Sequence, residues 1–144
     1  MNARDLMTPD PACCTRDTPL QEVARMMVRH DCGEIPVVEG QDRKKVVGVV
    51  TDRDIVCRAV AEGKSPADVK VEAVMTSPAI TVTERAGSDE VTQTMESHQI
   101  RRVPVVDQNG TLCGMVAQAD IARRLPRQET GELVRDVSAR SSRP

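Results

Sequence analysis

The feature that most constrains this chain is an internal duplication. Three short landmarks recur in the same order, the first two at an offset of 68 residues and the third at 66: residues 5–8 with 73–76, 35–38 with 103–106, and 48–55 with 114–121. Such a repeat indicates one supersecondary unit that is built twice. The change of offset corresponds to two extra residues in a hairpin of the first copy, which a surface loop tolerates easily.

Each copy is predicted to contain a strand, a helix, two strands and a second helix. In the first copy, a helical stripe of apolar residues follows Thr18-Pro19: Leu20, Val23, Ala24 and Met27. Thr18 is expected to be the N-cap of this helix and Pro19 its first residue. Strands are predicted at residues 12–15, 35–38 and 46–50, and a helix from residue 52 until Gly63 ends it. The second copy is predicted to have strands at 79–82, 103–106 and 112–117 and helices at 89–97 and 120–126.

The predicted fold class is therefore α+β, with two β-α-β-β-α repeats. Four segments are expected: repeat 1 at residues 1–63, a linker at 64–72, repeat 2 at 73–126 and a polar C-terminal tail at 127–144. Each three-stranded sheet leaves one apolar face bare, so we expect the repeats to pack sheet to sheet with pseudo-twofold symmetry. In the tail, Leu133, Val134 and Val137 are expected to form one or two amphipathic turns, and residues 138–144 to be disordered.

Composition argues against two classes of partner. The chain contains no Phe, Tyr or Trp, and its formal net charge is −2. Because it lacks both aromatic stacking platforms and a basic excess, we expect no binding to nucleic acid. No apolar run approaches the roughly 20 residues that span a bilayer, and there is no signal-peptide pattern, so we expect a cytoplasmic protein without a membrane partner.

The most informative stretch is residues 46–55, where a β-branched strand runs into a helix. Thr51 and Asp54 stand at the positions of an N-cap and of the third helical residue. This spacing is that of a capping box, in which each side chain bonds the backbone N–H of the other residue. The same residues could serve a ligand, because a helix N-terminus attracts phosphate and an aspartate accepts hydrogen bonds from ribose hydroxyls. Both interpretations are open, and they apply to Asp52 as well.

The five cysteines are an odd number without a framework spacing, which favours buried thiols in a reducing compartment. Cys13 and Cys14 with Cys32 and His30 could hold Zn²⁺, or one of the first two could form a disulfide with Cys32. Adjacent strand residues point to opposite faces and no C-x-x-C is present, so we expect no metal site. His30 and His98 occupy equivalent positions in the two copies and are expected to be polar residues at helix ends.

The paired landmarks resemble tandem CBS (cystathionine β-synthase) domains. The resemblance covers residues 3–124 and is greatest to stand-alone bacterial CBS-pair proteins that carry Thr-Asp-Arg-Asp-Ile-Val, here residues 51–56, and His-Gln-Ile-Arg-Arg-Val-Pro-Val-Val-Asp, here residues 98–107. It implies a module that binds AMP, ADP, ATP or sometimes S-adenosylmethionine in clefts between its repeats. It also implies a homodimer. No cofactor is implied as a requirement.

The resemblance further implies which residues bind the ligand in a first cleft: Thr51, Asp52, Asp54, Ala79, Ile80, Ile100, Arg101, Arg102 and Pro104. Asp54 would hold the ribose, and Thr51 with the helix N-terminus would meet phosphate oxygen. Ile80 and Ile100 would sandwich the base. One of the two arginines would pair with phosphate through charge-assisted hydrogen bonds.

The second cleft is predicted to be degraded. Here the motif threonine is replaced by Ala117, which removes the hydroxyl, although Asp120 keeps its place. The two arginines are replaced by Gly33 and Glu34, so attraction to a phosphate becomes repulsion. With Asp120 and Ile35 as its remaining residues, this cleft is expected to bind an uncharged nucleoside portion or nothing.

We therefore expect a regulatory or sensor module rather than an enzyme, because no catalytic triad pattern or phosphate-binding glycine loop is recognisable. The nucleotide would shift an equilibrium that an unidentified protein partner reads. Two alternatives stay open: a stress-related structural or interaction protein with vestigial clefts, and a redox or metal sensor that works through the cysteines.

Overall fold

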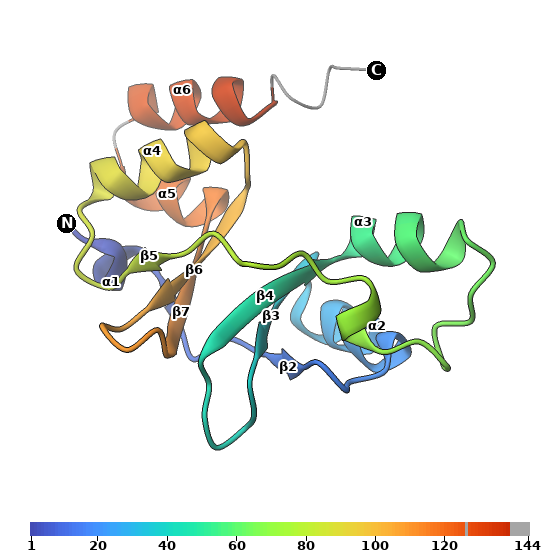
Figure 1. Cartoon of the computed structure of the whole chain (residues 1–144). Helices are drawn as coiled ribbons and strands as arrows, with labels where there is room; N and C mark the ends of the chain where they lie inside the picture. Colours follow the sequence, from blue (N-terminus) through green and yellow to red (C-terminus); the bar gives the residue numbers. More distant parts are fainter. Residues whose placement is uncertain (126, 139–144) are drawn as a thin grey trace. The chain divides into compact units, whose positions relative to one another are not determined.

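The structure is a computed structural model that describes residues 1–125 and 127–138, and the chain divides into two compact units. Unit 1 contains residues 1–11, residues 81–108 and the chain from Cys113 onward. Unit 2 contains residues 12–80 and 109–112. Each unit combines one sheet with several helices, which confirms the predicted α+β class (Figure 1).

Unit 2 is built on a three-stranded sheet in the order β2-β3-β4. Its strands are β2 (Cys14–Thr15), β3 (Glu34–Val38) and β4 (Val46–Thr51), with β2 parallel and β4 antiparallel to β3. Its helices are α2 (Leu20–His30), α3 (Asp52–Ile55), a π-helical turn (Val56–Val60) that continues α3, and a 3₁₀ turn (Val71–Ala73). The core contains apolar residues from all these elements: Cys14, Leu20, Val23, Met27, Ile35, Val37, Val50, Ile55, Ala59, Val71 and Val74.

Unit 1 has a four-stranded sheet in the order β1-β7-β6-β5. Its strands are β1 (Thr8–Pro9), β5 (Val82–Thr83), β6 (Arg102–Val106) and β7 (Leu112–Ala117). Its helices are α1 (Ala3–Leu6), α4 (Ser88–His98), α5 (Gln118–Arg124) and α6 (Arg127–Ser138). The core is again aliphatic: Ala3, Leu6, Val82, Ala86, Val91, Met95, Val103, Val105, Val116, Ile121, Leu133 and Val137.

The opening segment of each repeat packs in the unit that holds the hairpin of the other repeat. Leu6, from the start of repeat 1, is 2% exposed in the core of unit 1. Val71 and Val74, from the linker and the start of repeat 2, are buried in the core of unit 2. The sequence repeats and the compact units therefore differ by an exchange of these segments.

Two glycines of the repeated landmark make room for the exchanged segments. A Cβ at Gly48 would lie 2.7 Å from the Thr76 carbonyl oxygen, and one at Gly114 would lie 2.9 Å from the Thr8 carbonyl oxygen. Real Cβ atoms do not approach a backbone atom so closely. In unit 2 the close approach brings Val49 and Thr76 together, and each donates its N–H to the carbonyl oxygen of the other, at 2.9 and 2.8 Å. The Met-Thr and glycine landmarks are thus contact partners.

The start of α2 differs from the expectation. The helix begins at Leu20 with Pro19 as its N-cap residue, so Pro19 is not the first helical residue. The Thr18 hydroxyl accepts a hydrogen bond from the Thr15 N–H at 3.1 Å and does not cap the helix. The prediction for Thr18 was wrong because its side chain closes the turn after β2 instead. The strand predicted at residues 79–82 is displaced, because β5 contains only Val82 and Thr83. The other predicted elements are present, although β2 is reduced to two residues.

The C-terminal segment is more ordered than predicted. Instead of one or two turns, α6 is a helix of 12 residues whose Leu133 and Val137 side chains are 0% and 3% exposed in the core of unit 1. It lies alongside α4 (Figure 1), and the Gln99 side-chain amide donates to the Asp136 carbonyl oxygen at 3.4 Å. Residues 139–144, which belong to the segment predicted to be disordered, lie outside the described residues.

The expectation that the two repeats pack sheet to sheet with pseudo-twofold symmetry stays a prediction. Among the described residues, none of the helices has both the length and the apolar composition that a membrane crossing requires.

Candidate functional site

The strand-to-helix junction of unit 2 contains the capping box that the sequence predicts. The Thr51 hydroxyl accepts a hydrogen bond from the Asp54 N–H at 3.1 Å, and the Asp54 Oδ2 atom accepts one from the Thr51 N–H at 3.0 Å. Thr51 is extended, with φ −112° and ψ 161°, as an N-cap residue should be. Asp54 is 9% exposed. The cap therefore fixes the orientation of a nearly buried carboxylate.

The backbone amides at this helix start already have acceptors. The Asp52 N–H donates to the Gly33 carbonyl oxygen at 2.9 Å, and the Arg53 N–H donates to Oδ1 of Asp52 at 2.8 Å. The Asp54 N–H is bound by the Thr51 hydroxyl, as described above. A phosphate at this helix N-terminus would have to displace one of these bonds, so the amides alone do not form an open anion site. The Asp52 carboxylate thus binds an N–H at the start of its own helix, while the Asp52 N–H binds the Gly33 carbonyl oxygen.

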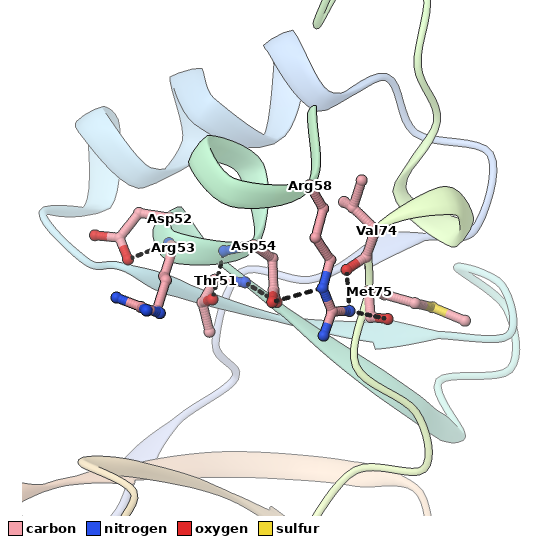
Figure 2. A network of polar contacts seen from close by, with 7 residues as sticks. All are labelled: Thr51, Asp52, Arg53, Asp54, Arg58, Val74 and Met75. Atoms are coloured by element: carbon pink, nitrogen blue, oxygen red, sulfur yellow. Dashed lines mark hydrogen bonds and ion pairs between the residues drawn. The ribbon is translucent and has the colours of Figure 1, made fainter. Parts of the chain in front are cut away.

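The second oxygen of Asp54 has a different environment, shown in Figure 2. Oδ1 lies 3.9 Å from Nε of Arg58, an ion-pair distance that is too long for a hydrogen bond. The Arg58 Nη1 atom donates to the carbonyl oxygens of Val74 at 2.9 Å and Met75 at 3.3 Å. The guanidinium thus lies beside Oδ1 without occupying it. Arg58 was missed by the sequence analysis, although its position four residues after Asp54 on a helix was an available signal.

The equivalent junction of unit 1 is closed. Ala117 has nearly the same backbone angles as Thr51, but it offers no side-chain oxygen to the helix. Asp120 keeps its half of the cap, because its Oδ2 atom accepts from the Ala117 N–H at 2.8 Å. Its Oδ1 atom is in direct contact with Nη2 of Arg123. Position 123 corresponds to Cys57 in unit 2. Both oxygens of Asp120 are therefore used within the unit, whereas Asp54 keeps one available.

The remaining predicted ligand residues are distributed over both units. Ala79 is half-buried and Ile80 is 37% exposed in unit 2, where Ile35 belongs to the core. The others lie in unit 1, just before or within β6: Ile100 and Arg102 are half-buried, Arg101 is exposed and Pro104 is buried. The structure thus brings together the three residues of the Thr51–Asp54 junction.

The arginine pair has a distinct local setting. The Arg101 carbonyl oxygen accepts a hydrogen bond from the Gln118 N–H at 2.9 Å, as the Gly33 carbonyl oxygen does from the Asp52 N–H in unit 2. The two helix starts are therefore held to their sheets by the same backbone bond. In unit 2 this backbone bond joins a neutral glycine to an acidic aspartate, and in unit 1 it joins a basic arginine to a neutral glutamine.

The five cysteines form no disulfide bond with one another. Burial, with smaller contributions from Cys13 and Glu22, raises the pKa of Cys14 to about 12, so this thiol stays protonated and is a weak nucleophile and ligand. Burial also raises the pKa of Cys113, as do Glu84 and Asp107. No three His, Cys, Asp or Glu side chains among the described residues are grouped as metal ligands.

The two histidines lie where the repeat predicts. His30 and His98 are the last residues of α2 and α4. The His98 Nδ1 atom is 3.0 Å from the Thr94 carbonyl oxygen, one helical turn earlier. Both histidines are helix-end residues, as expected.

Comparison with known proteins finds one matching domain family and relatives of similar length. The CBS domain family matches residues 3–60 and 71–127. The protein YlbB of Bacillus subtilis is 38% identical over 141 residues, which cover 97% of this chain and 93% of YlbB. Hypoxic response protein 1 of Mycobacterium tuberculosis is 35% identical over 135 residues, which cover 94% of this chain and 92% of the relative.

Solved structures share the fold. The crystal structure of Hypoxic Response Protein I with two coordinated zinc ions has a TM-score of 0.79 at 35% identity and covers 88% of this chain and 100% of the other. The CBS domain protein PAE2072 of Pyrobaculum aerophilum, complexed with AMP, has a TM-score of 0.77 at 28% identity, with coverages of 94% and 99%. The CBS domain pair of protein MJ0100, in complex with 5′-methylthioadenosine and S-adenosylmethionine, has a TM-score of 0.75 at 29% identity, with coverages of 85% and 98%. Because the family match and these relatives span both repeats, the chain belongs to the CBS-domain family and carries a pair of these domains.

Proposed function

We propose that the chain is a regulatory module that binds an adenosine-containing nucleotide at the Thr51–Asp54 junction. Two structural relatives support the ligand class, since PAE2072 was crystallised with AMP and the MJ0100 pair with 5′-methylthioadenosine and S-adenosylmethionine. These compounds share an adenine base and a ribose ring with 2′- and 3′-hydroxyls, and neither phosphate nor sulfur is common to them. The base and ribose are therefore the recognised part that we carry over to this chain.

The observation that carries the proposal is the asymmetry of the Asp54 carboxylate. Oδ2 is held by the Thr51 N–H, whereas Oδ1 accepts no hydrogen bond from the described residues. An ionised carboxylate oxygen is a strong acceptor, and ribose hydroxyls are the donors that acidic residues bind in other nucleotide sites. Because the cap fixes the rotamer in advance, little side-chain entropy is lost when a ribose binds.

The other residues of the proposed site come from the family resemblance. Thr51 would contact a phosphate oxygen of the ligand, in addition to its capping role. We infer that Ile80 and Ile100 sandwich the base and that Ala79 belongs to the same binding site, since in a chain without aromatic residues the base must lie against aliphatic side chains. Arg101 and Arg102 would supply positive charge for a phosphate.

We further infer that the module acts by binding and not by catalysis. A nucleotide that prefers one arrangement of the protein shifts its population, and a separate protein partner can read that shift. We also infer a homodimer that works in the cytoplasm, where adenosine nucleotides are available.

The direct test is isothermal titration calorimetry with adenosine, AMP, ATP and S-adenosylmethionine, since the protein has no aromatic residues for intrinsic fluorescence. Asp54→Asn is the diagnostic variant because the amide oxygen can keep the cap while the carboxylate charge is lost. Asp120→Asn is the matched control at the closed junction. A hydrogen bond to a charged acceptor contributes about 1.5–3 kcal/mol, so Asp54→Asn should weaken adenosine binding by about tenfold or more.

Two outcomes would contradict the proposal. One is the absence of heat with every adenosyl compound, in folded protein that is free of co-purified nucleotide. The other is an equal loss of affinity in Asp54→Asn and Asp120→Asn, which would mean that the Asp54 carboxylate has no special role.

A further inference from the structure

We propose that Arg58 makes the Asp54 site selective for ligands that carry a 5′-phosphate, an inference that rests on the proposed adenosine site. The resemblance assigns phosphate to Arg101 and Arg102, which lie in unit 1. The structure points to a cation in unit 2 itself, on the π-helical turn that follows α3.

The first argument is that the guanidinium is held in place. Its Nη1 atom donates to two carbonyl oxygens, those of Val74 and Met75, and its Nε atom points toward Asp54 (Figure 2). An arginine held by such contacts is pre-organised, so less rotamer entropy is lost when it binds an anion. The π-helical turn places it on the same side of the helix as Asp54, and such turns occur frequently at functional sites.

The second argument is that Arg58 keeps donor capacity. Its side chain is 53% exposed, and among the described residues none binds its Nη2 atom. Arginine carries five N–H donors in a planar fork, and phosphate oxygens are preferred acceptors for that fork. A half-exposed, oriented guanidinium with an unused edge is therefore suited to an incoming anion.

The third argument is the position of this donor relative to the open acceptor. Oδ1 of Asp54 and the Arg58 guanidinium lie side by side without a hydrogen bond between them. A ribose phosphate carries hydroxyl donors and an anionic group only a few bonds apart. It can therefore donate to Asp54 and accept from Arg58 at the same time, whereas adenosine satisfies only the aspartate.

The equivalent arginine of the other repeat provides the comparison. Arg124 corresponds to Arg58 and likewise donates to a backbone carbonyl oxygen, that of Asp5, at 2.8 Å. In this unit, however, Oδ1 of Asp120 is bound by Arg123. Unit 1 thus has the anchored cation without the open acceptor, and Arg124 is a matched control.

The experiment compares the affinities of AMP and adenosine by calorimetry in the full-length chain. Arg58→Gln keeps an amide that can donate to the carbonyl oxygens but removes the charge, and Arg58→Lys keeps the charge. The ratio of AMP to adenosine affinity should fall by about tenfold in Arg58→Gln, as expected for loss of one charge-assisted bond. The ratio should be largely retained in Arg58→Lys and unchanged in Arg124→Gln.

The outcomes separate this inference from the proposed function. If the wild-type chain binds neither compound, the proposed adenosine site itself fails. If it binds both, the inference is overturned when Arg58→Gln weakens AMP and adenosine by the same factor, which is the result of a merely structural role. It is also overturned when Arg53→Gln, a variant of the neighbouring exposed arginine, lowers the ratio and Arg58→Gln does not. Thermal unfolding of each variant shows whether the protein titrated is folded.

Discussion

Replacing Ala117 with threonine should complete the missing half of a capping box and stabilise unit 1. The backbone at Ala117 has φ −108° and ψ 159°, within a few degrees of Thr51 at −112° and 161°. Asp120 already accepts from the Ala117 N–H at 2.8 Å, so the new hydroxyl would meet the Asp120 N–H as Thr51 meets Asp54. No backbone movement is needed for the new bond to form.

The magnitude follows from measured N-caps. Exchange of a capping hydroxyl for alanine changes stability by about 1 kcal/mol, within a range of roughly 0.5–2 kcal/mol. For a chain of this size, that corresponds to an increase in the melting temperature of roughly 2–5 °C. The reverse change, Thr51→Ala, should cost a similar amount in unit 2.

The assay is urea and thermal unfolding followed by far-UV circular dichroism. Ala117→Val is the control, because valine has the shape of threonine and lacks the hydroxyl. If Ala117→Thr is no more stable than Ala117→Val, the gain does not come from the cap, and the reasoning from the Thr51 junction is refuted.

The remaining predictions concern the core and a thiol. Leu133→Ala should lower the free energy of unfolding by about 2–5 kcal/mol, because this α6 side chain is fully buried. Val134→Ala, at a position 42% exposed on the same helix, should change it by less than about 0.5 kcal/mol, and equal effects of the two variants would contradict the packing of α6. Cys14 should resist alkylation in the native protein at a mildly alkaline pH at which exposed Cys57 reacts, because burial raises the pKa of Cys14 to about 12. Rapid alkylation of Cys14 in folded protein would contradict its burial. The contribution of the protonated Cys14 thiol to the free energy of unfolding is fully present below the ordinary thiol pKa of 9.0 and is lost as the pH rises toward 12.

Local patterns predicted the secondary structure well because local interactions decide it. The apolar stripe from Leu20 to Met27 lies on α2, and the β-branched run before Thr51 is β4. The capping box between Thr51 and Asp54 is present because its two residues are neighbours on one turn of helix. Thr18 shows the limit, since its hydroxyl binds the Thr15 N–H before the helix instead of an N–H of α2, and the sequence pattern did not distinguish the two roles.

Nonlocal contacts were outside the reach of such patterns. Nothing in the residues around Leu6 indicates that it enters the core of the unit that holds repeat 2. The contacts of Arg58 with Val74 and Met75 likewise join residues that are 16 and 17 positions apart, through a backbone whose path only the fold defines. The sequence patterns that mark the start and end of a helix did not indicate that α6 extends over 12 residues.

The sequence by itself determined the duplication, the α+β class and the position of the two Thr/Ala-x-x-Asp junctions, because each is encoded in the order and spacing of a few residues. Only the tertiary structure decided which carboxylate oxygen is available. Asp54 and Asp120 have the same place in their repeats, yet Oδ1 of Asp120 is bound by Arg123 while Oδ1 of Asp54 lies 3.9 Å from Arg58. Part of that difference is encoded in the sequence, because Cys57 stands where unit 1 has Arg123. The direction of Arg58, however, depends on the Val74 and Met75 carbonyl groups to which it donates, and these contacts are set by packing and not by sequence spacing.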